Sequence, residues 1–310
     1  MLRFASLLLF MLSLSMSVPL TSRAQEASPT PAAAKAATPT SSSTAITTET
    51  LAEITLPAAS LPPSPAVVDV WLATLRPGEQ LGFETGASPP SIVADVVLSG
   101  ELKVLSEGRL QVLRAAGRED VPANTVVTIH PDETVIYVDN QAAQTFRNTS
   151  REMLTALSFG VFSAAPPSTF TEGEVSQEDW ARSGLAGQDL TVSVKRLTVP
   201  PQGSLPAFTP DVQTPRIFVV AEGAAQWAII PPGGATPTAS YPLKRGETLG
   251  FRTLATGEQL QLRNAEDQPL VLLQVTLSAD RAATPVAGPD RLPKWPVSTP
   301  GMKPGPADAG

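Results

Sequence analysis

The chain has 310 residues, of which 42% are hydrophobic and 16% are charged, a composition typical of globular domains rather than of a fibrous or fully disordered protein. Its formal net charge of -7 argues against a nucleic-acid partner, because a phosphate backbone is bound by clustered Lys and Arg. The absence of cysteine excludes disulfides, zinc–thiolate and iron–sulfur sites, and cysteine nucleophiles.

The first 24 residues have the pattern of a secretory signal peptide. Arg3 supplies a positive charge, residues 7–14 are mostly apolar, and positions 22 and 24 carry small side chains before a cleavage site after Ala24. An uncleaved anchor is the alternative, but serines and a proline interrupt the apolar stretch that would have to span about 20 residues. We therefore predict a secreted or extracytoplasmic protein with no membrane span after cleavage.

Two segments are predicted to be disordered. Residues 25–65 are rich in Ala, Ser, Thr and Pro, and residues 281–310 are rich in Pro and Gly. Neither segment has enough large apolar side chains to offset the entropy of ordering the chain. We expect a flexible spacer after the signal peptide and a solvated tail at the other end.

The region between these segments has the alternation of β-strands. Leu190, Val192 and Val194 would share one face of a strand, and Leu157, Phe159 and Val161 would share one face of another strand. The only helix expected is the segment 171–184. We predict one domain over residues 66–165, a connector over residues 166–187, and a second domain over residues 188–280.

The two domains repeat a pattern. "SIVADVVLSGELKVL" is interrupted at Gly100, and "PRIFVVAEGAAQWAII" is interrupted in the same way at Gly223. Further along, "QTFRNTSREMLTALSFGVF" in the first copy matches "LQLRNAEDQPLVLLQVTL" in the second. The common order and spacing indicate an internal duplication.

The repeated pattern resembles the cupin superfamily. "LRPGEQL" and "LTVPPQGSL" are similar to the turn that opens the first cupin motif, while "PDETVIYVDNQAAQTFRN" and "RGETLGFRTLATGEQLQLRN" are similar to the second motif. The resemblance implies an all-β fold of two tandem jelly-roll (cupin-like) barrels in one chain, a bicupin. It implies little about function, because one fold supports unrelated activities.

The resemblance also implies that the metal-binding positions are lost. The histidine of the second motif falls on Gln144 and Leu260, and the glutamate of the first motif falls on Val93 and Arg216. The one histidine of the chain, His130, is interpreted as an exposed turn residue. We expect no metal and no other cofactor, although calcium bound by acidic side chains and backbone oxygens is the alternative that composition leaves open.

Asparagine and acidic residues are expected to stabilise turns. Asn148 begins a formal glycosylation sequon, but its match with Asn264, which has no sequon, favours a turn role. Asp132-Glu133 and Glu247 are expected to cap tight turns.

These observations favour an exported, non-catalytic binding or scaffold protein. The candidate ligand-binding residues are Gln144, Phe146, Leu260 and Arg216, and the expected ligand is a small uncharged molecule or a carbohydrate. One alternative is a metal-independent enzyme of the sugar isomerase or epimerase type, which would need inward-pointing acids; none stands at the matching positions. The other alternative is a structural, stalked surface protein whose barrels bind nothing.

Overall fold

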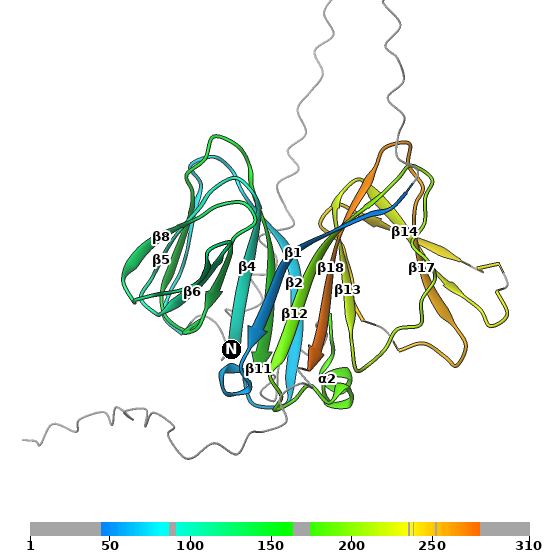
Figure 1. Ribbon diagram of the computed structural model, residues 1–310, viewed down its shortest axis with the longest axis horizontal. Helices are drawn as coiled ribbons and strands as arrows, with labels where there is room; N and C mark the ends of the chain where they lie inside the picture. Colours follow the sequence, from blue (N-terminus) through cyan, green and yellow to red (C-terminus); the bar gives the residue numbers. More distant parts are fainter. Residues whose placement is uncertain are drawn as a thin grey trace, which may run out of the picture. The chain divides into compact units, whose positions relative to one another are not determined.

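The computed structural model describes residues 45–86, 91–163, 174–234, 236–237, 239–251 and 253–279 (Figure 1). The predicted signal peptide, residues 25–44 of the predicted spacer and the predicted tail lie outside the described residues. Across the described ranges, no helix combines the length and apolar character needed to cross a membrane.

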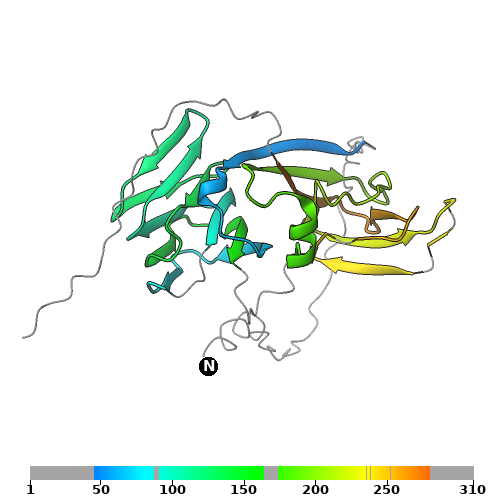
Figure 2. The ribbon, with the colours of Figure 1, turned by 90° about the horizontal axis from the view of Figure 1, so that it is seen from below.

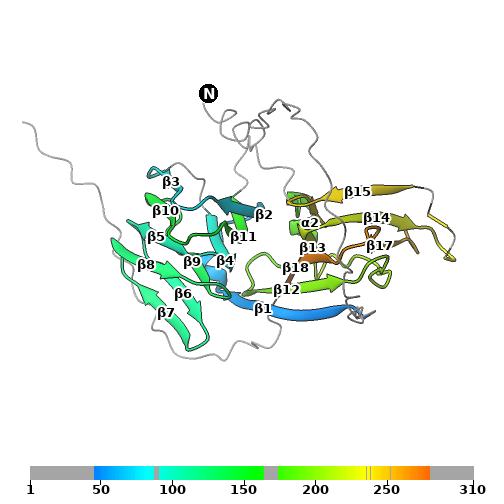
Figure 3. The same ribbon diagram turned by 90° about the horizontal axis from the view of Figure 1, so that it is seen from above.

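The first half of the chain forms a barrel of two antiparallel sheets, which we call barrel 1 (Figure 3). The larger sheet has the order β2 (Ala66–Leu75), β11 (Leu154–Ser163), β4 (Ser91–Ser99), β9 (Thr134–Tyr137), β6 (Leu110–Arg114) and β7 (Gly117–Val121). The smaller sheet has the order β3 (Gln80–Phe83), β10 (Gln144–Asn148), β5 (Leu102–Ser106) and β8 (Thr125–Ile129).

The second half of the chain, together with the N-terminal strand β1, forms barrel 2 on the same plan. One sheet has the order β1 (Thr47–Leu56), β12 (Leu190–Val199), β18 (Leu270–Ala279), β13 (Arg216–Glu222) and β16 (Thr248–Leu249), and the other has the order β15 (Ser240–Lys244), β14 (Ala224–Ile230) and β17 (Gln259–Asn264). The predicted fold class, all-β with two tandem barrels, is therefore confirmed.

The duplicated sequence signals have duplicated structural roles. Gly100 and Gly223 connect a strand of one sheet to a strand of the other, with φ of 77° and 79°, which glycine adopts without steric cost. Asn148 and Asn264 are fully buried, and each donates hydrogen bonds through Nδ2 to backbone carbonyls, including those of Glu152 and Gln268. The predicted turn role of the asparagines is confirmed.

The predicted spacer is wrong over its second half. Strand β1 lies within it and pairs with β12 along its whole length, from Thr47 opposite Thr198 to Leu56 opposite Leu190 (Figure 2, blue strand). A short 3-10 helix, η1 (Ala58–Ser60), follows. Because β1 belongs to the sheet of barrel 2, the N-terminal strand joins the barrel that comes second in the sequence.

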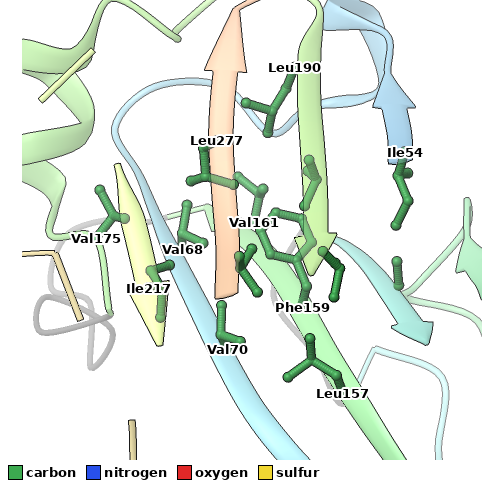
Figure 4. Close-up of a cluster of buried hydrophobic side chains, with 14 of the residues drawn as sticks. Ile54, Val68, Val70, Leu157, Phe159, Val161, Val175, Leu190, Ile217 and Leu277 are labelled. Atoms are coloured by element: carbon green, nitrogen blue, oxygen red, sulfur yellow. The ribbon is translucent and has the colours of Figure 1, made fainter. Parts of the chain in front are cut away.

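The largest hydrophobic core lies between the two barrels. The outward faces of β2, β4 and β11 of barrel 1 pack there with the faces of β1, β12, β13 and β18 that point away from the interior of barrel 2 (Figure 4). The two predicted apolar faces both contribute to it, since Leu157, Phe159, Val161, Leu190, Val192 and Val194 are all buried in this cluster. The alternate residues of the same strands fill two separate cores, one inside each barrel.

The predicted connector contains α2 (Gln177–Ser183), within the helix expected from the sequence. Ser176 caps its N-terminus by accepting a hydrogen bond from the backbone N–H of Asp179, and Gly184 ends it with a φ of 72°. Trp180 anchors the helix in the core between the barrels, where it is 1% exposed.

Candidate functional site

Gln144, the predicted metal-position residue of barrel 1, begins β10 and faces the interior. It lies opposite Phe83 of β3 and Ser106 of β5, and it is 6% exposed. Its Nε2 donates to Oδ1 of Asn140 at 3.2 Å, and Nδ2 of Asn140 in turn donates to Oγ of Ser91 at 2.7 Å. These hydrogen bonds satisfy the amide nitrogen of Gln144 within the protein; a role of Gln144 in binding stays a prediction.

Phe146, two residues along β10, lies in a row of three aromatic side chains. Its ring contacts Phe83 edge-to-face with the centroids 5.6 Å apart, and it contacts Tyr137 in the same way at 5.5 Å. Phe83 is at the surface and 41% exposed, whereas Tyr137 is 1% exposed. The row therefore leads from the surface of barrel 1 into its interior.

Two pockets adjoin the hydrogen-bonded chain of Gln144, Asn140 and Ser91. The first has a volume of about 380 Å³ and is lined by Gln144 together with residues at the ends of β3 and β5, including Phe83, Glu84 and Glu107. The second has a volume of about 320 Å³ and is lined by Ser91 and Asn140 together with residues that surround η1. The polar chain thus connects two surface depressions at one end of barrel 1.

A buried acidic cluster lies deeper in barrel 1, and the sequence analysis missed it. Oδ2 of Asp95 accepts a hydrogen bond from Tyr137 Oη at 2.7 Å, and its Oδ1 accepts one from Ser158 Oγ at 2.6 Å. Burial raises the pKa of Asp95, although both hydrogen bonds oppose the rise, and burial together with the charge of Asp95 raises the pKa of Tyr137. The sequence did contain the signal, because Asp95 alternates with the apolar residues Val93 and Val97.

A second acid faces the same interior from the edge strand β2. Asp69 lies on the face of β2 that carries Val67, and burial raises its pKa, while a hydrogen bond with the backbone of Val70 acts in the opposite direction. Trp71, the next residue on that face, is 36% exposed, and its ring centroid lies 6.4 Å from that of Phe162. Barrel 1 therefore holds two inward-facing carboxyl groups, neither of them at a cupin metal position.

Barrel 2 has no such cluster at the corresponding positions. Asp95 lies opposite Ser158, whereas the equivalent residue of barrel 2, Phe218, lies opposite Gln274. Leu260 is buried in the apolar core of barrel 2, and Arg216 is exposed with its guanidinium 5.5 Å from the centroid of Phe208. The four predicted ligand-binding residues therefore lie in two different barrels and do not form one site.

The four positions at which the resemblance places metal ligands carry no histidine and no acidic residue. Val93 is buried in the apolar core of barrel 1, and Gln144, Leu260 and Arg216 offer no imidazole or carboxylate. No group of three or more His, Cys, Asp or Glu that could hold an ion occurs in the described part of the chain. His130 is exposed in its turn, as predicted, and its Nδ1 lies 3.7 Å from Oε2 of Glu101.

Searches with the whole sequence found no matching family model and no matching curated protein. Among solved structures, AerE from Microcystis aeruginosa is 12% identical, over 68% of this chain and 87% of AerE, with a TM-score of 0.37. Vicilin from Solanum lycopersicum (tomato) is 10% identical, over 69% and 75% of the two chains, with a TM-score of 0.38. The oxalate decarboxylase of Lactobacillus farciminis, in a formate complex, is 12% identical over 67% and 77%, with a TM-score of 0.35. The two-barrel, all-β fold of this chain is established by its own sheets.

Proposed function

We propose that this protein is an exported, non-catalytic binding protein that holds a small molecule at the Gln144 end of barrel 1. One observation carries the proposal: a pocket of about 380 Å³ has in its lining Gln144, a polar residue that is only 6% exposed. The predicted signal peptide supports export, and the loss of the metal-position residues supports binding without catalysis.

The hydrogen-bonded chain fixes the orientation of this amide. Asn140 uses Nδ2 to donate to Ser91, so its Oδ1 accepts from Nε2 of Gln144. That leaves Oε1 of Gln144 as an acceptor without a partner in the described structure. Every enclosed side-chain nitrogen or oxygen of the described residues has a partner, so this Oε1 reaches solvent.

The lining suits a small molecule that carries hydrogen-bond donors on an apolar or ring-shaped body. Thr145 and Asn124 add a hydroxyl and an amide, and Phe83 and Leu105 add apolar surface. Small uncharged molecules and carbohydrates have this combination of polar groups and apolar faces.

The variant Gln144→Leu tests the proposal, because it removes the acceptor and keeps a side chain of similar size. A panel of neutral saccharides is screened by thermal shift, and each hit is confirmed by calorimetry. We expect a hit whose binding is lost in Gln144→Leu and retained in the matched control Gln274→Leu in barrel 2. A ligand at about 100 times its Kd stabilises the folded state by about 2.7 kcal/mol, which a melting curve detects readily. Equal binding by both variants would refute a site at Gln144.

A second candidate function is a metal-independent enzyme, which the inward-facing acids Asp69 and Asp95 favour. Both oxygens of Asp95 accept hydrogen bonds from protein side chains, so Asp69 is the carboxyl group left for proton transfer. An isomerase would exchange the proton next to the carbonyl of an aldose or ketose with deuterium from heavy water. Exchange that depends on Asp69, tested with Asp69→Asn, would favour the enzyme; a lack of exchange across a sugar panel would favour the binding protein.

A further inference from the structure

We propose that the outer face of the smaller sheet of barrel 1 is a self-association surface, through which two copies of this chain form a twofold-symmetric dimer. The sheet consists of β3, β10, β5 and β8, and none of these strands contributes to the core between the barrels. The inference goes beyond the proposed function, because Gln144 lies on the opposite, interior face of the same sheet.

An exposed apolar row crosses the middle of the outer face. Leu105 of β5 lies directly opposite Val126 of β8, and the two side chains are 40% and 50% exposed. Thr145 and Gly82 continue the row across β10 and β3. Adjacent exposed apolar side chains that are surrounded by charged ones are typical of a surface that another protein covers.

Charges of opposite sign lie on the two sides of the apolar row. On one side, Lys103 of β5 is directly opposite Arg147 of β10, and both are exposed. On the other side, Glu84 follows β3 and Glu107 follows β5, and both line the same surface pocket. Within the described residues, no ion pair involves any of these four side chains. Like charges directly opposite each other in a sheet repel, so the basic side favours a partner that brings carboxylates to it.

A second copy of the same face supplies these carboxylates. A twofold axis along the apolar row turns the second copy so that its acidic side covers the basic side of the first, and the reverse. Strand β5 then faces β5 of the second copy, so that Leu105 meets Leu105 and Lys103 lies over Glu107. Arg147 lies between Glu84 and Glu107 of the second copy, because β10 is between β3 and β5 in the sheet. Facing sheets pack about 10 Å apart, a distance that a lysine and a glutamate side chain span together.

The corresponding face of barrel 2 lacks this pattern, although its strands are paired in the same way. Arg263 of β17 stands where barrel 1 has Arg147, but it lies opposite Gln226 rather than a second cation. At the positions of the apolar pair, Ala228 and Ser240 lie opposite each other. The fold therefore requires neither the apolar row nor the paired cations, and their occurrence on barrel 1 favours a role in association.

The small area of the face sets the expected affinity. Four strands about 4.8 Å apart and five residues of about 3.3 Å each give a face of roughly 19 by 17 Å. Such an area is at the low end for specific interfaces, so we expect a weak dimer with a Kd on the order of 10–100 µM. Because exposed ion pairs contribute to this affinity, the Kd should rise with salt.

Sedimentation equilibrium tests the inference on the full-length protein, at concentrations from about ten-fold below to about ten-fold above that Kd. Lys103→Glu places like charges against each other twice in each dimer, so it should weaken association at least about ten-fold. Adding Glu107→Lys to this variant restores opposite charges at both places and should restore most of the association. Arg263→Glu is the matched control, because it makes the same reversal of charge on the equivalent sheet of barrel 2, and it should leave association unchanged.

Leu105→Ser removes the apolar centre without changing the charge, and it should also weaken the dimer; unchanged thermal melts verify that these surface variants fold. A protein that stays monomeric over the whole range, or a dimer that neither Lys103→Glu nor Leu105→Ser weakens, would overturn the inference. So would a double variant that associates as weakly as Lys103→Glu alone. Gln144 is intact in Lys103→Glu, so the saccharide screen repeated on that variant tests the proposed function whether or not the dimer exists.

Discussion

Removing strand β1 should destabilise the protein, even though the composition of its segment resembles a dispensable spacer. A protein that begins at Leu61 lacks Ile54 and Leu56, both 1% exposed in the core between the barrels. Burial of each such side chain contributes about 1.5–3 kcal/mol, so these two alone account for roughly 3–6 kcal/mol. The loss also uncovers β12, which pairs with β1 over its whole length.

Thermal melts of three proteins measure this effect: one that begins at Gln25, one at Ala45 and one at Leu61. For a domain of this size, each kcal/mol corresponds to about 2–4 °C in Tm, so the protein that begins at Leu61 should melt at least about 6 °C lower than the one that begins at Ala45. The first two proteins should melt together, because β1 is intact in both.

Point variants distinguish the effect of losing buried side chains from the effect of removing the whole N-terminal segment. Ile54→Ala should cost about 2–5 kcal/mol, as for other large-to-small changes in cores, and Thr48→Ala on the exposed part of β1 should cost much less. If the protein that begins at Leu61 melted together with the longer ones, β1 would contribute nothing to the fold, and the burial of Ile54 and Leu56 would be no guide to stability.

Three further predictions concern the buried polar groups and the metal positions. Burial raises the folded-state pKa of Asp95 above its unfolded value of about 3.9, so its contribution to stability is fully present below that value and is lost as the pH rises. Urea unfolding at about pH 4 and about pH 7 should therefore show that the wild type loses stability relative to Asp95→Asn as the pH rises. A difference in stability that does not change with pH would contradict this. Asn148→Ala and Asn264→Ala should each cost roughly 2–4 kcal/mol in urea unfolding, because each leaves buried backbone carbonyls without a donor; a cost near zero for either would remove its turn role. The purified protein should contain no stoichiometric transition metal by mass spectrometry, because Gln144 and Leu260 replace the histidines, and one equivalent per barrel would contradict that assignment.

Local signals predicted the parts of the fold that depend on local physics. Alternation identified the strands, since a residue that is buried on one face repeats every second position. The glutamates expected to cap turns do so: Glu133 accepts a hydrogen bond from the backbone N–H of His130, and Glu247 accepts one from Lys244. Turn residues act within four residues of chain, so one sequence is enough to assign them.

The features that the sequence analysis missed depend on contacts between residues far apart in the chain, or on a polar residue at a position where the alternation predicts an apolar one. Strand β1 pairs with β12, far along the chain, and a register shift between Thr50 and Ala52 interrupts the alternation that would have indicated it. The sequence shows Asp95 at a position that alternation assigns to the buried face of its strand. Only the fold, however, brings the hydroxyl groups of Tyr137 and Ser158 to its two carboxylate oxygens. The pocket that Glu84, Glu107 and Gln144 line exists because three strand ends meet, which no local pattern encodes.

The two barrels share one plan but have diverged in their interiors. Burying a carboxylate lowers the stability of the folded state unless hydrogen bonds compensate for the loss of its water shell. The buried Asp95 of barrel 1, which is hydrogen-bonded to Ser158, is therefore expected to lower stability. Barrel 2 has Phe218 and Gln274 at the same two positions, which shows that the fold does not need the acid. Barrel 2 supplies β12, β13, β18 and the N-terminal strand to the common core. A buried acid that lowers stability, and that the second barrel lacks, is expected where binding or chemistry retains it, so Asp95 favours barrel 1 as the place of the proposed function.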